Sequence, residues 1–432
     1  KMGYLEKRGL KGPWLLDGAG GDNFSLAVVI PALAESRTLP ATLASLERNP
    51  ADFLERTLVV AVVNNTPQAR EADREDNRQT LAQLKRYSGP LRLAWVDAAS
   101  SGRELPLGEG VGSARKIGFD LVLRHCRNNR GPPAILVSLD ADTLVDENYL
   151  AAIDSHFRCH DEGGAVLPFR HRCCGHPAID RAIAQYELFL RGYVLGLSWA
   201  GSPYAWHTIG SAIACRADAY VACGGMNRRP SAEDFYFVQQ LVKTCGVTPL
   251  HGTVVGPSPR PSRRVPFGTG PTVAGLLGTP GKGLDFYPVE AFDILKEWLA
   301  TMARNHGDEG RFLLDKARNL SPHLENFLQM LNFAENWRKL QRNHGDPQRL
   351  LAAFHGWFDG LRTRQLLHRL ACNPFSWRRS DQSVPPLMKR LLLPLSPHPQ
   401  VQLEILRCHQ GAYPAIAGAR CGQSTLFNAP TP

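Results

Sequence analysis

The sequence predicts an α/β protein in which a Rossmann-like, mixed but mostly parallel sheet carries helices on both faces, followed by a mainly helical region. Three observations lead to this class. Short β-branched runs alternate with helical periodicities over the first 250 residues, a segment rich in Gly and Pro comes next, and helical patterns fill the remainder. Such alternation is typical of βαβ units. The expected bounds are an N-terminal extension over 1–23, the α/β domain over 24–251, a loop over 252–285 and a helical accessory domain over 286–432.

The first domain begins with four predicted strands, which cover 24–31, 58–64, 91–97 and 134–140. Apolar residues recur near every 3.6 positions between them, which predicts helices over 38–48, 70–87 and 112–126. Ligands of such sheets bind beyond the carboxyl ends of the strands. The residues that end each strand are therefore the first candidates for a site.

The segment 252–283 is the predicted loop. Gly and Pro occupy 14 of its 32 positions, so we expect neither a helix nor a central strand there. Loops of this length are uncommon unless they cover a site or link domains. The segment holds Arg260, Arg263, Arg264 and Lys282 and no acid. We therefore expect a mobile lid whose arginines close over a diphosphate.

Helical runs are expected beyond residue 285, over 289–303, 311–317, 322–340, 348–361 and 363–371. Between 360 and 390 seven basic residues stand against the single acid Asp381. One interpretation of this run is a solvated helix face. The other is peripheral contact with an anionic membrane surface or with a phosphorylated, lipid-linked acceptor.

Composition excludes several classes of protein. The charged and apolar fractions are those of a globular chain. The sequence contains no run of 18 apolar residues, which is about the length that a membrane-spanning helix needs. The chain starts with Lys and shows no apolar stretch typical of a signal peptide. Ten scattered cysteines without a Cys-x-x-Cys pair indicate reduced thiols in a cytoplasmic protein. The net charge of +10 favours an anionic partner such as a nucleoside diphosphate, a nucleic acid or lipid headgroups.

The strongest motif is Asp140-Ala141-Asp142, at the end of the fourth predicted strand. Two carboxylates two residues apart point the same way from an extended chain, and hard divalent cations prefer oxygen ligands. Such an ion can neutralise a departing nucleoside diphosphate. The alternative is a strand-end turn with two solvated acids.

Two further motifs lie near predicted helix starts. Glu233 and Asp234 open a helix expected over 234–243, where they either cap the helix and compensate its dipole or supply a general base for an acceptor hydroxyl. Arg115 and Lys116 follow glycines at another helix start, which is either a phosphate site or a pair of surface charges.

In this order, the segments PALAE, NNT, GVGSARKIG, SLDAD, GSAIACRADAYVACGG and AEDFYF resemble family-two glycosyltransferases of the GT-A fold. The resemblance covers about 24–264, and the Asp-x-Asp and the Gly-Gly…Glu-Asp pair are its specific parts. It implies a UDP- or GDP-sugar donor, Mn²⁺ or Mg²⁺, and inverting transfer to a hydroxyl of a glycan, lipid-linked or small-molecule acceptor.

The resemblance also implies roles for particular residues. It assigns the base to Asp234, acceptor contact to Glu233, and the metal to Asp140 and Asp142. The donor-binding residues that it implies are Pro31, Ala32, Glu35, Asn64, Asn65, Arg115, Lys116, Asp140, Ala141 and Asp142. The cationic loop adds Arg260, Arg263 and Arg264 as expected contacts of the donor diphosphate. The chain departs from the family at Ala34, Asn64 and Lys116, which puts the identity of the nucleoside base in doubt.

Three other positions are candidates. His251, at the end of a strand expected over 247–250, is the expected third metal ligand, and an ordinary loop histidine is the alternative. Trp206 offers an apolar face on which an acceptor sugar could stack, and His207 adjoins it. Core packing is the alternative for Trp206.

Two other functions share parts of this pattern. A pyrophosphorylase-like nucleotidyltransferase would need a cationic Gly-rich loop after the first strand, which Pro31–Glu35 lacks. The departures at Ala34, Asn64 and Lys116 would permit a non-catalytic binding protein with the GT-A fold. The intact Asp140, Asp142 and Asp234 argue against it. Nucleic-acid binding is disfavoured because the basic residues are not interleaved with aromatic residues for stacking.

Overall fold

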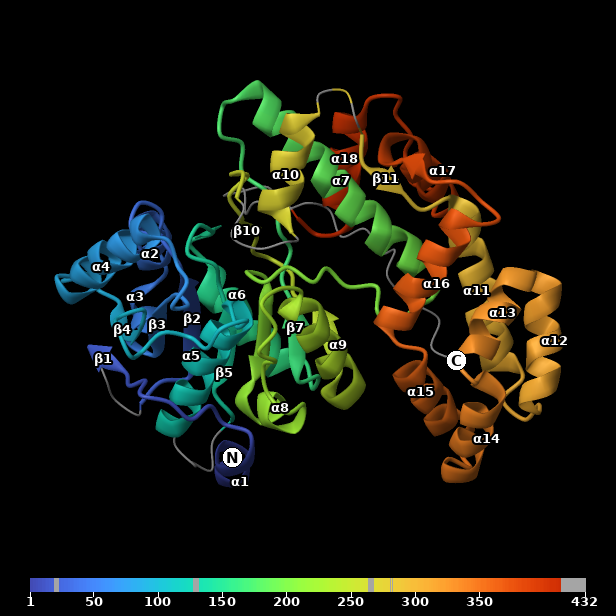
Figure 1. The fold of residues 1–432 in the computed structure, drawn as a ribbon, viewed down its shortest axis with the longest axis horizontal. Coiled ribbons are helices and arrows are strands. Elements are labelled where there is room, and N and C mark those ends of the chain that lie inside the picture. Colours follow the sequence, from blue (N-terminus) through green and yellow to red (C-terminus); the bar gives the residue numbers. More distant parts are fainter. Residues whose placement is uncertain (19–22, 127–131, 263–267, 280, 282, 413–432) are drawn as a thin grey trace.

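A computed structural model describes residues 1–18, 23–126, 132–262, 268–279, 281 and 283–412 of the chain (Figure 1). Its centre is an eight-stranded sheet in the order β1-β4-β3-β2-β5-β8-β7-β9. The strands are β1 Asp17–Gly18, β2 Leu26–Ala32, β3 Thr57–Asn64, β4 Arg92–Ala98, β5 Ile135–Ser138, β7 Gly164–Val166, β8 Ile213–Arg216 and β9 Val247–Pro249.

Most neighbouring strands in this sheet are parallel. β2 pairs in parallel with β3 and β5, β3 with β4, and β7 with β9, whereas β8 runs antiparallel to β5 and β7. β1 is antiparallel to β4. The expected mixed, mostly parallel sheet is therefore confirmed. The carboxyl ends of β2, β3, β4, β5, β7 and β9 consequently lie at one edge of the sheet.

Helices cover both faces of the sheet, as predicted. The first face carries α2 Leu39–Glu47, α3 Ala51–Glu55, α4 Glu71–Lys85 and α6 Tyr149–Cys159. The second face carries α1 Met2–Lys7, α5 Val111–His125, α8 Ala217–Ala222 and α9 Glu233–Cys245. Every residue of β2 and β3 is buried, which is why these strands appear in the sequence as continuous apolar runs.

The N-terminal residues pack onto the sheet domain. Tyr4 and Trp14 are buried in the core of the second face, and β1 pairs with β4 so that Asp17 lies opposite Trp95. The described part of the predicted extension is therefore continuous with the sheet domain.

The prediction of a segment without helix after residue 252 is wrong. It contains α10 Thr269–Gly278, and β10 Val255–Gly256 pairs with β6 Leu144–Val145. Pro271 lies in the first turn of α10, where a missing N–H costs nothing. Val273 is fully buried against Ala182 and Ile183, so packing stabilises a helix that composition disfavours.

The helical region follows β11 Asp285–Phe286, which pairs with β12 Arg378–Arg379. The single helix expected over 322–340 is divided into two helices at Asn332, which has a φ of 51°. The helices of the region are α11 Val289–Arg304, α12 Gly310–Leu320, α13 Pro322–Met330, α14 Phe333–Asn343, α15 Pro347–Trp357, α16 Gly360–Cys372, α17 Ser380–Arg390 and α18 Pro399–His409.

The sequence patterns above did not predict α7 Pro177–Trp199, which joins the two regions. Leu188, Leu195 and Leu197 of this helix belong to the core of the helical region. Figure 1 shows α7 between the sheet domain and the helical region, and its packing neighbours include α10, α17 and α18. A helix that precedes residue 285 in the chain therefore packs in the core of the helical region that follows it.

The basic run 362–390 does not form one exposed face. Arg378, Arg379 and Arg390 pair with Glu290 at 3.0 Å, Asp381 at 3.1 Å and Asp293 at 2.6 Å respectively. The side chain of Leu392 is 92% exposed just beyond the run. None of the helices in the described ranges is both long and apolar enough to span a bilayer. Peripheral membrane contact stays a prediction.

Candidate active site

Asp140 and Asp142 lie where β5 ends, at the carboxyl edge of the sheet. Their side chains are 35% and 21% exposed. Two hydrogen bonds hold the backbone of this segment. Thr42 Oγ1 donates to the Ala141 carbonyl at 2.9 Å, and Arg172 Nη2 donates to the Asp142 carbonyl at 2.8 Å. The strand end thus holds two accessible carboxylates on a rigid support.

Arg115, on the first turns of α5, connects two of the predicted motifs. Its guanidinium group pairs with Asp140 at 2.5 Å and also with Glu233, and only 3% of the side chain is exposed. Gly210 makes room for it, because a Cβ at that position would overlap the guanidinium group. Arg115 therefore holds the end of β5 against the start of α9.

Arg260 makes the corresponding connection on the other side of the site. It pairs with Asp142 at 2.9 Å and also with Glu35, the buried acid that follows β2. The predicted lid thus contributes a cation to the strand ends in this conformation. Closure of the lid stays a prediction. Arg263 and Arg264 lie outside the described residues.

The resulting cluster contains five carboxylates (Glu35, Asp140, Asp142, Glu233 and Asp234) and two guanidinium groups (Arg115 and Arg260). Fully ionised, it carries three uncompensated negative charges. Burial, and after it the negative charge of Glu233, raises the pKa of Asp234 to about 7. Burial likewise raises the pKa of Glu233, although Arg115 opposes that shift. An excess of negative charge in a partly closed site is what a divalent cation would neutralise.

The chain enters α9 through a strained residue. Ala232 has a φ of 56°, in the left-handed region that residues other than Gly rarely adopt. Asn227 holds the turn by donating from Nδ2 to the Glu233 carbonyl at 2.8 Å. Strain of this kind often marks functional sites. Here it orients the two acids that open α9.

Several predicted donor-binding residues are engaged by the backbone instead. Asn64 Nδ2 donates to the carbonyls of Ala32 at 3.2 Å and Val62 at 3.0 Å, and Asn65 Oδ1 accepts from Asn77 at 2.8 Å. Both asparagines are buried. Pro31 and Ala32 form the end of β2 itself. These four residues shape the edge of the site, Asn64 through main-chain carbonyls and Asn65 through the side chain of Asn77.

The structure does not bring Lys116 into the site. Its ammonium group is buried on the other side of α5, 3.1 Å from Asp120 and 2.7 Å from the Tyr4 hydroxyl. The tyrosines Tyr4 and Tyr220 both donate to Asp120. Lys116 therefore attaches the N-terminal helix to the sheet domain, and its assignment to the donor is wrong.

Replacing Lys116 with Met will destabilise the fold by about 3–5 kcal/mol, because the buried carboxylate of Asp120 keeps its hydrogen bonds from Tyr4 and Tyr220 but loses the positive charge of Lys116. Denaturant unfolding will measure this loss, with Lys85→Met, at an exposed lysine on α4, as the control. Nucleotide affinity of the folded variant should equal that of the parent protein. A tenfold weaker affinity would restore Lys116 to the donor site.

The predicted acceptor residues Trp206 and His207 face the interior. The Trp206 indole donates to the Pro203 carbonyl at 2.9 Å and packs on the second-face core. His207 Nε2 lies 2.9 Å from Gln410 Oε1, beyond α18. Burial, followed by the charge of Arg191, lowers the pKa of His207 to about 3, so the ring is neutral. Neither side chain is therefore placed to receive a sugar here.

His251 does not join the aspartates. It lies beside His160 and Gly411, and burial lowers its pKa. Among the residues that the structure describes, no three His, Cys, Asp or Glu side chains come together as a metal site. His251 is therefore not a third ligand in this conformation.

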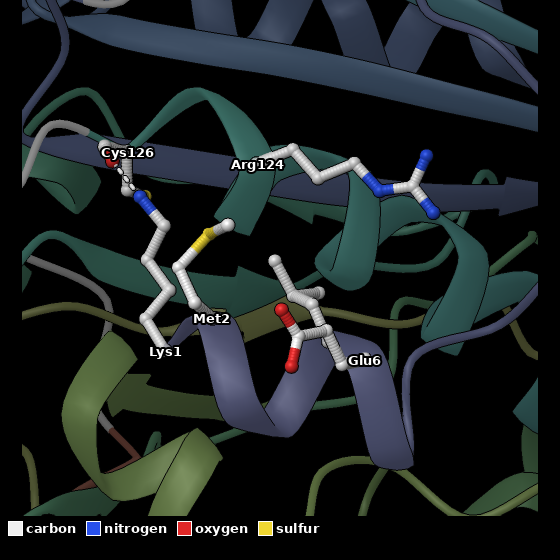
Figure 2. Close-up of a pocket in the computed structure, with 6 residues that line it drawn as sticks. Lys1, Met2, Glu6, Arg124 and Cys126 are labelled. Carbon is white, nitrogen blue, oxygen red and sulfur yellow. Dashed lines mark hydrogen bonds between the residues drawn. The ribbon is translucent and has the colours of Figure 1, made fainter.

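A surface pocket lies away from this site, between α1 and the end of α5. Figure 2 shows Lys1, Met2, Glu6, Arg124 and Cys126 around it, with Lys1 Nζ donating to the Cys126 carbonyl. It contains none of the acidic residues of the cluster, and nothing links it to the chemistry.

Sequence reasoning missed the residues that come from the helical region. Burial and then the charge of Asp234 raise the pKa of Tyr186 on α7 to about 12, and the charge of Arg364 on α16 opposes this shift. In the sequence Arg364 is one of seven basic residues between 360 and 390, and nothing in that run distinguishes it from the other six.

The sheet order and the acidic cluster at its carboxyl edge define an α/β protein with a mixed, mostly parallel sheet and a charged site at the strand ends. No family model matches the chain, and no curated protein matches it by sequence.

Solved structures do match. S. aureus TarS 1–349 in complex with UDP-GlcNAc is 13% identical with a TM-score of 0.37, over 76% of this chain and 90% of that one. The mannosyltransferase PcManGT from Pyrobaculum calidifontis, in complex with GDP-Man and Mn²⁺, is 17% identical with a TM-score of 0.35, over 95% and 94%. Glucosyl-3-phosphoglycerate synthase from Mycobacterium tuberculosis, in complex with UDP, is 14% identical with a TM-score of 0.33, over 61% and 84%. The chain spans 37% of a longer TarS structure. Similarity this low does not assign an activity, so the function is inferred from the residues of the site.

Proposed function

We propose that the protein is a metal-dependent glycosyltransferase that moves a sugar from a UDP- or GDP-sugar to an acceptor hydroxyl with inversion. The observation that carries the proposal is the convergence of Asp140, Glu233 and Asp234 on Arg115 at the carboxyl edge of the sheet, where Arg260 also pairs with Asp142. Residues 94 positions apart in the sequence, from two predicted motifs, form one charge cluster.

Asp140 and Asp142 would hold the divalent ion. Their oxygen donors match Mn²⁺ and Mg²⁺ in chemistry, and the negative excess of the cluster favours a cation. When bound, the ion would neutralise charge on the donor diphosphate. Arg260 already contacts Asp142, so it is placed to bind the same diphosphate beside the ion.

Asp234 is the base in this proposal. As the acceptor oxygen bonds to the anomeric carbon, its proton passes to the Asp234 carboxylate. The bond from the anomeric carbon to the diphosphate oxygen breaks, and its electron pair leaves with the nucleoside diphosphate. Attack opposite the leaving group inverts the configuration. A base with a pKa of about 7 is matched to neutral pH, which supports this role. Glu233, held by Arg115, orients the start of α9 beneath the acceptor.

The direct test is hydrolysis of nucleotide sugars in the absence of acceptor. We expect the purified protein with Mn²⁺ to release nucleoside diphosphate from one member of a panel of UDP- and GDP-sugars, and EDTA to stop the release. Release of pyrophosphate from a sugar phosphate and a nucleoside triphosphate would instead favour a nucleotidyltransferase. No turnover and no nucleotide binding with the whole panel would favour a non-catalytic protein.

A further inference from the structure

Arg172 connects the aspartates after β5 to the segment that carries Arg260. Its Nη2 donates to the Asp142 carbonyl at 2.8 Å, and its Nε donates to the Gly256 carbonyl at 3.0 Å. The side chain is half-buried, and among the residues that the structure describes it forms no ion pair with a carboxylate. The guanidinium group therefore acts as a fork that joins two backbone segments.

The backbone around Arg172 belongs to a small sheet beside the site. The Arg172 amide donates to the Pro257 carbonyl at 3.0 Å, and Phe169 forms a parallel bridge with Val255. On its other side β10 pairs with β6, which begins two residues after Asp142. The Arg172 side chain thus crosses β10 to reach the loop that carries the aspartates.

Gly256 leaves room for this crossing. A Cβ at that position would lie 3.2 Å from Arg172 Cγ and 3.4 Å from Arg172 Cδ, which is tighter than an ordinary van der Waals contact. The φ of Gly256 lies outside the left-handed region, so its backbone is open to alanine. An alanine there would therefore press on the stem of the arginine without removing its charge or its donors.

The backbone of Asp142 is held from both directions. Thr42 of α2 donates to the carbonyl of Ala141, which precedes it, and Arg172 donates to the carbonyl of Asp142 itself. Peptide units are planar, so fixing the two units that flank a residue fixes its φ and ψ and the direction of its Cα–Cβ bond. These two donors therefore determine where the Asp142 carboxylate points.

The helical region holds the segment from which Arg172 projects. Glu187 of α7 accepts from the His171 amide at 3.0 Å, and it is bound by Arg191 at 2.9 Å and by Arg407 of α18 at 2.7 Å. The Glu187 side chain is fully buried, and those of the two arginines are nearly so. Buried charges paired in this way resist displacement, because separating them leaves an uncompensated charge. Arg172 thus extends from a rigid support.

We propose that Arg172 is a positioning residue, which sets the direction of the Asp142 carboxylate for the divalent ion. The inference rests on the proposed function, because it concerns the ion that Asp140 and Asp142 would hold. Loss of a group that holds a metal ligand from behind typically lowers metal affinity about 10–100-fold. In this role Arg172 acts through the backbone of Asp142 and touches neither ion nor substrate. The helical region thereby contributes to the geometry of the site.

The experiment compares Mn²⁺ binding by the parent protein with binding by Arg172→Met, Arg172→Lys, Gly256→Ala and Arg181→Gln. Arg172→Met keeps the apolar stem and removes every donor, whereas Arg172→Lys keeps the charge but not the fork. Arg181 is exposed on α7, so its replacement is the control for loss of a positive charge. Calorimetry titrates Mn²⁺ alone and Mn²⁺ with UDP or GDP, and melting temperatures are recorded for the metal-free proteins.

Positioning and charge predict opposite results. A cation near the ion repels it, so if Arg172 acted by charge alone, its loss would strengthen Mn²⁺ binding. We expect instead about 10–100-fold weaker binding in Arg172→Met, with a smaller loss in Arg172→Lys and in Gly256→Ala, where the charge is unchanged. The Mn²⁺ affinity of Arg181→Gln should stay within about twofold, because salt screens an exposed charge.

The melting temperatures separate ligand geometry from folding. A variant that melts like the parent protein and binds Mn²⁺ more weakly has lost the geometry alone. If Arg172→Met melts at a lower temperature, Arg172→Lys and Gly256→Ala carry the comparison. Mn²⁺ binding by the parent together with equal or tighter binding by these variants would overturn this inference alone. Absence of Mn²⁺ binding by the parent, with and without nucleotide, would overturn the metal dependence of the proposed function as well.

Discussion

Replacing Asp234 with Asn will slow sugar transfer by about 10²–10⁴-fold while donor affinity stays near that of the parent protein. The amide keeps the size of the side chain but cannot accept the acceptor proton. Steady-state kinetics and nucleotide titration will separate the two effects. Asp218→Asn, at the first turn of α8, is the matched control, because it also replaces an acid at a helix start. An equal loss of donor affinity would place Asp234 on the donor side.

The pH dependence of the parent protein follows from the same residue. Because the base must be ionised, kcat/KM should fall about tenfold per pH unit below an apparent pKa near 7. Glu233 is close enough that this value belongs to the pair of acids. In Asp234→Asn the residual activity should lose this limb. A limb unchanged in the variant would assign it to another group.

Stability should change in the opposite direction to activity. The pKa of Asp234 is about 7 in the folded protein and near 3.8 in an unfolded chain, so the folded state binds more protons between these values. The free energy of unfolding therefore decreases as pH rises through this window. Asp234→Asn removes the penalty and should stabilise the protein at pH 8 by about 2–4 kcal/mol. Equal stabilisation at pH 3.5 would point to a different cause.

The second large effect is expected at the aspartates of β5. Asp140→Asn or Asp142→Asn should weaken the metal-dependent binding of nucleoside diphosphate by at least about 100-fold, since each removes an ionic ligand of the divalent cation. The fold should persist, because Arg115 keeps Glu233 and Arg260 keeps Glu35.

Calorimetric titration of Mn²⁺ with nucleoside diphosphate will measure this loss, with EDTA as the metal-free reference. Asp52→Asn, at an exposed acid of α3, provides the control for removal of a charge. Unchanged titration in both aspartate variants would show that the donor binds without metal, through Arg115 and Arg260.

Local sequence determined the strands, most helices and the identity of the acids. β2 and β3 are buried on both faces, so their composition is apolar throughout and their position could be predicted to within a few residues. The Asp-x-Asp and the Glu-Asp pair could be recognised because each is contiguous. The location of the Asp-x-Asp also followed, since parallel strands end at one edge, whereas the Glu-Asp pair opens α9 and reaches that edge through tertiary packing.

Tertiary structure decided the rest because those contacts connect residues distant in the chain. Lys116 and Arg115 are neighbours in sequence, yet a helix directs them to opposite sides, one to Asp120 and the other to Asp140. Composition disfavoured α10, which forms because Val273 is buried against α7. The start of α16 meets α9 through a hydrogen bond from the Leu361 amide to Gln239 Oε1, which joins residues 122 positions apart in the sequence. No local pattern encodes such a contact, since the energy that holds it comes from burial between separate segments.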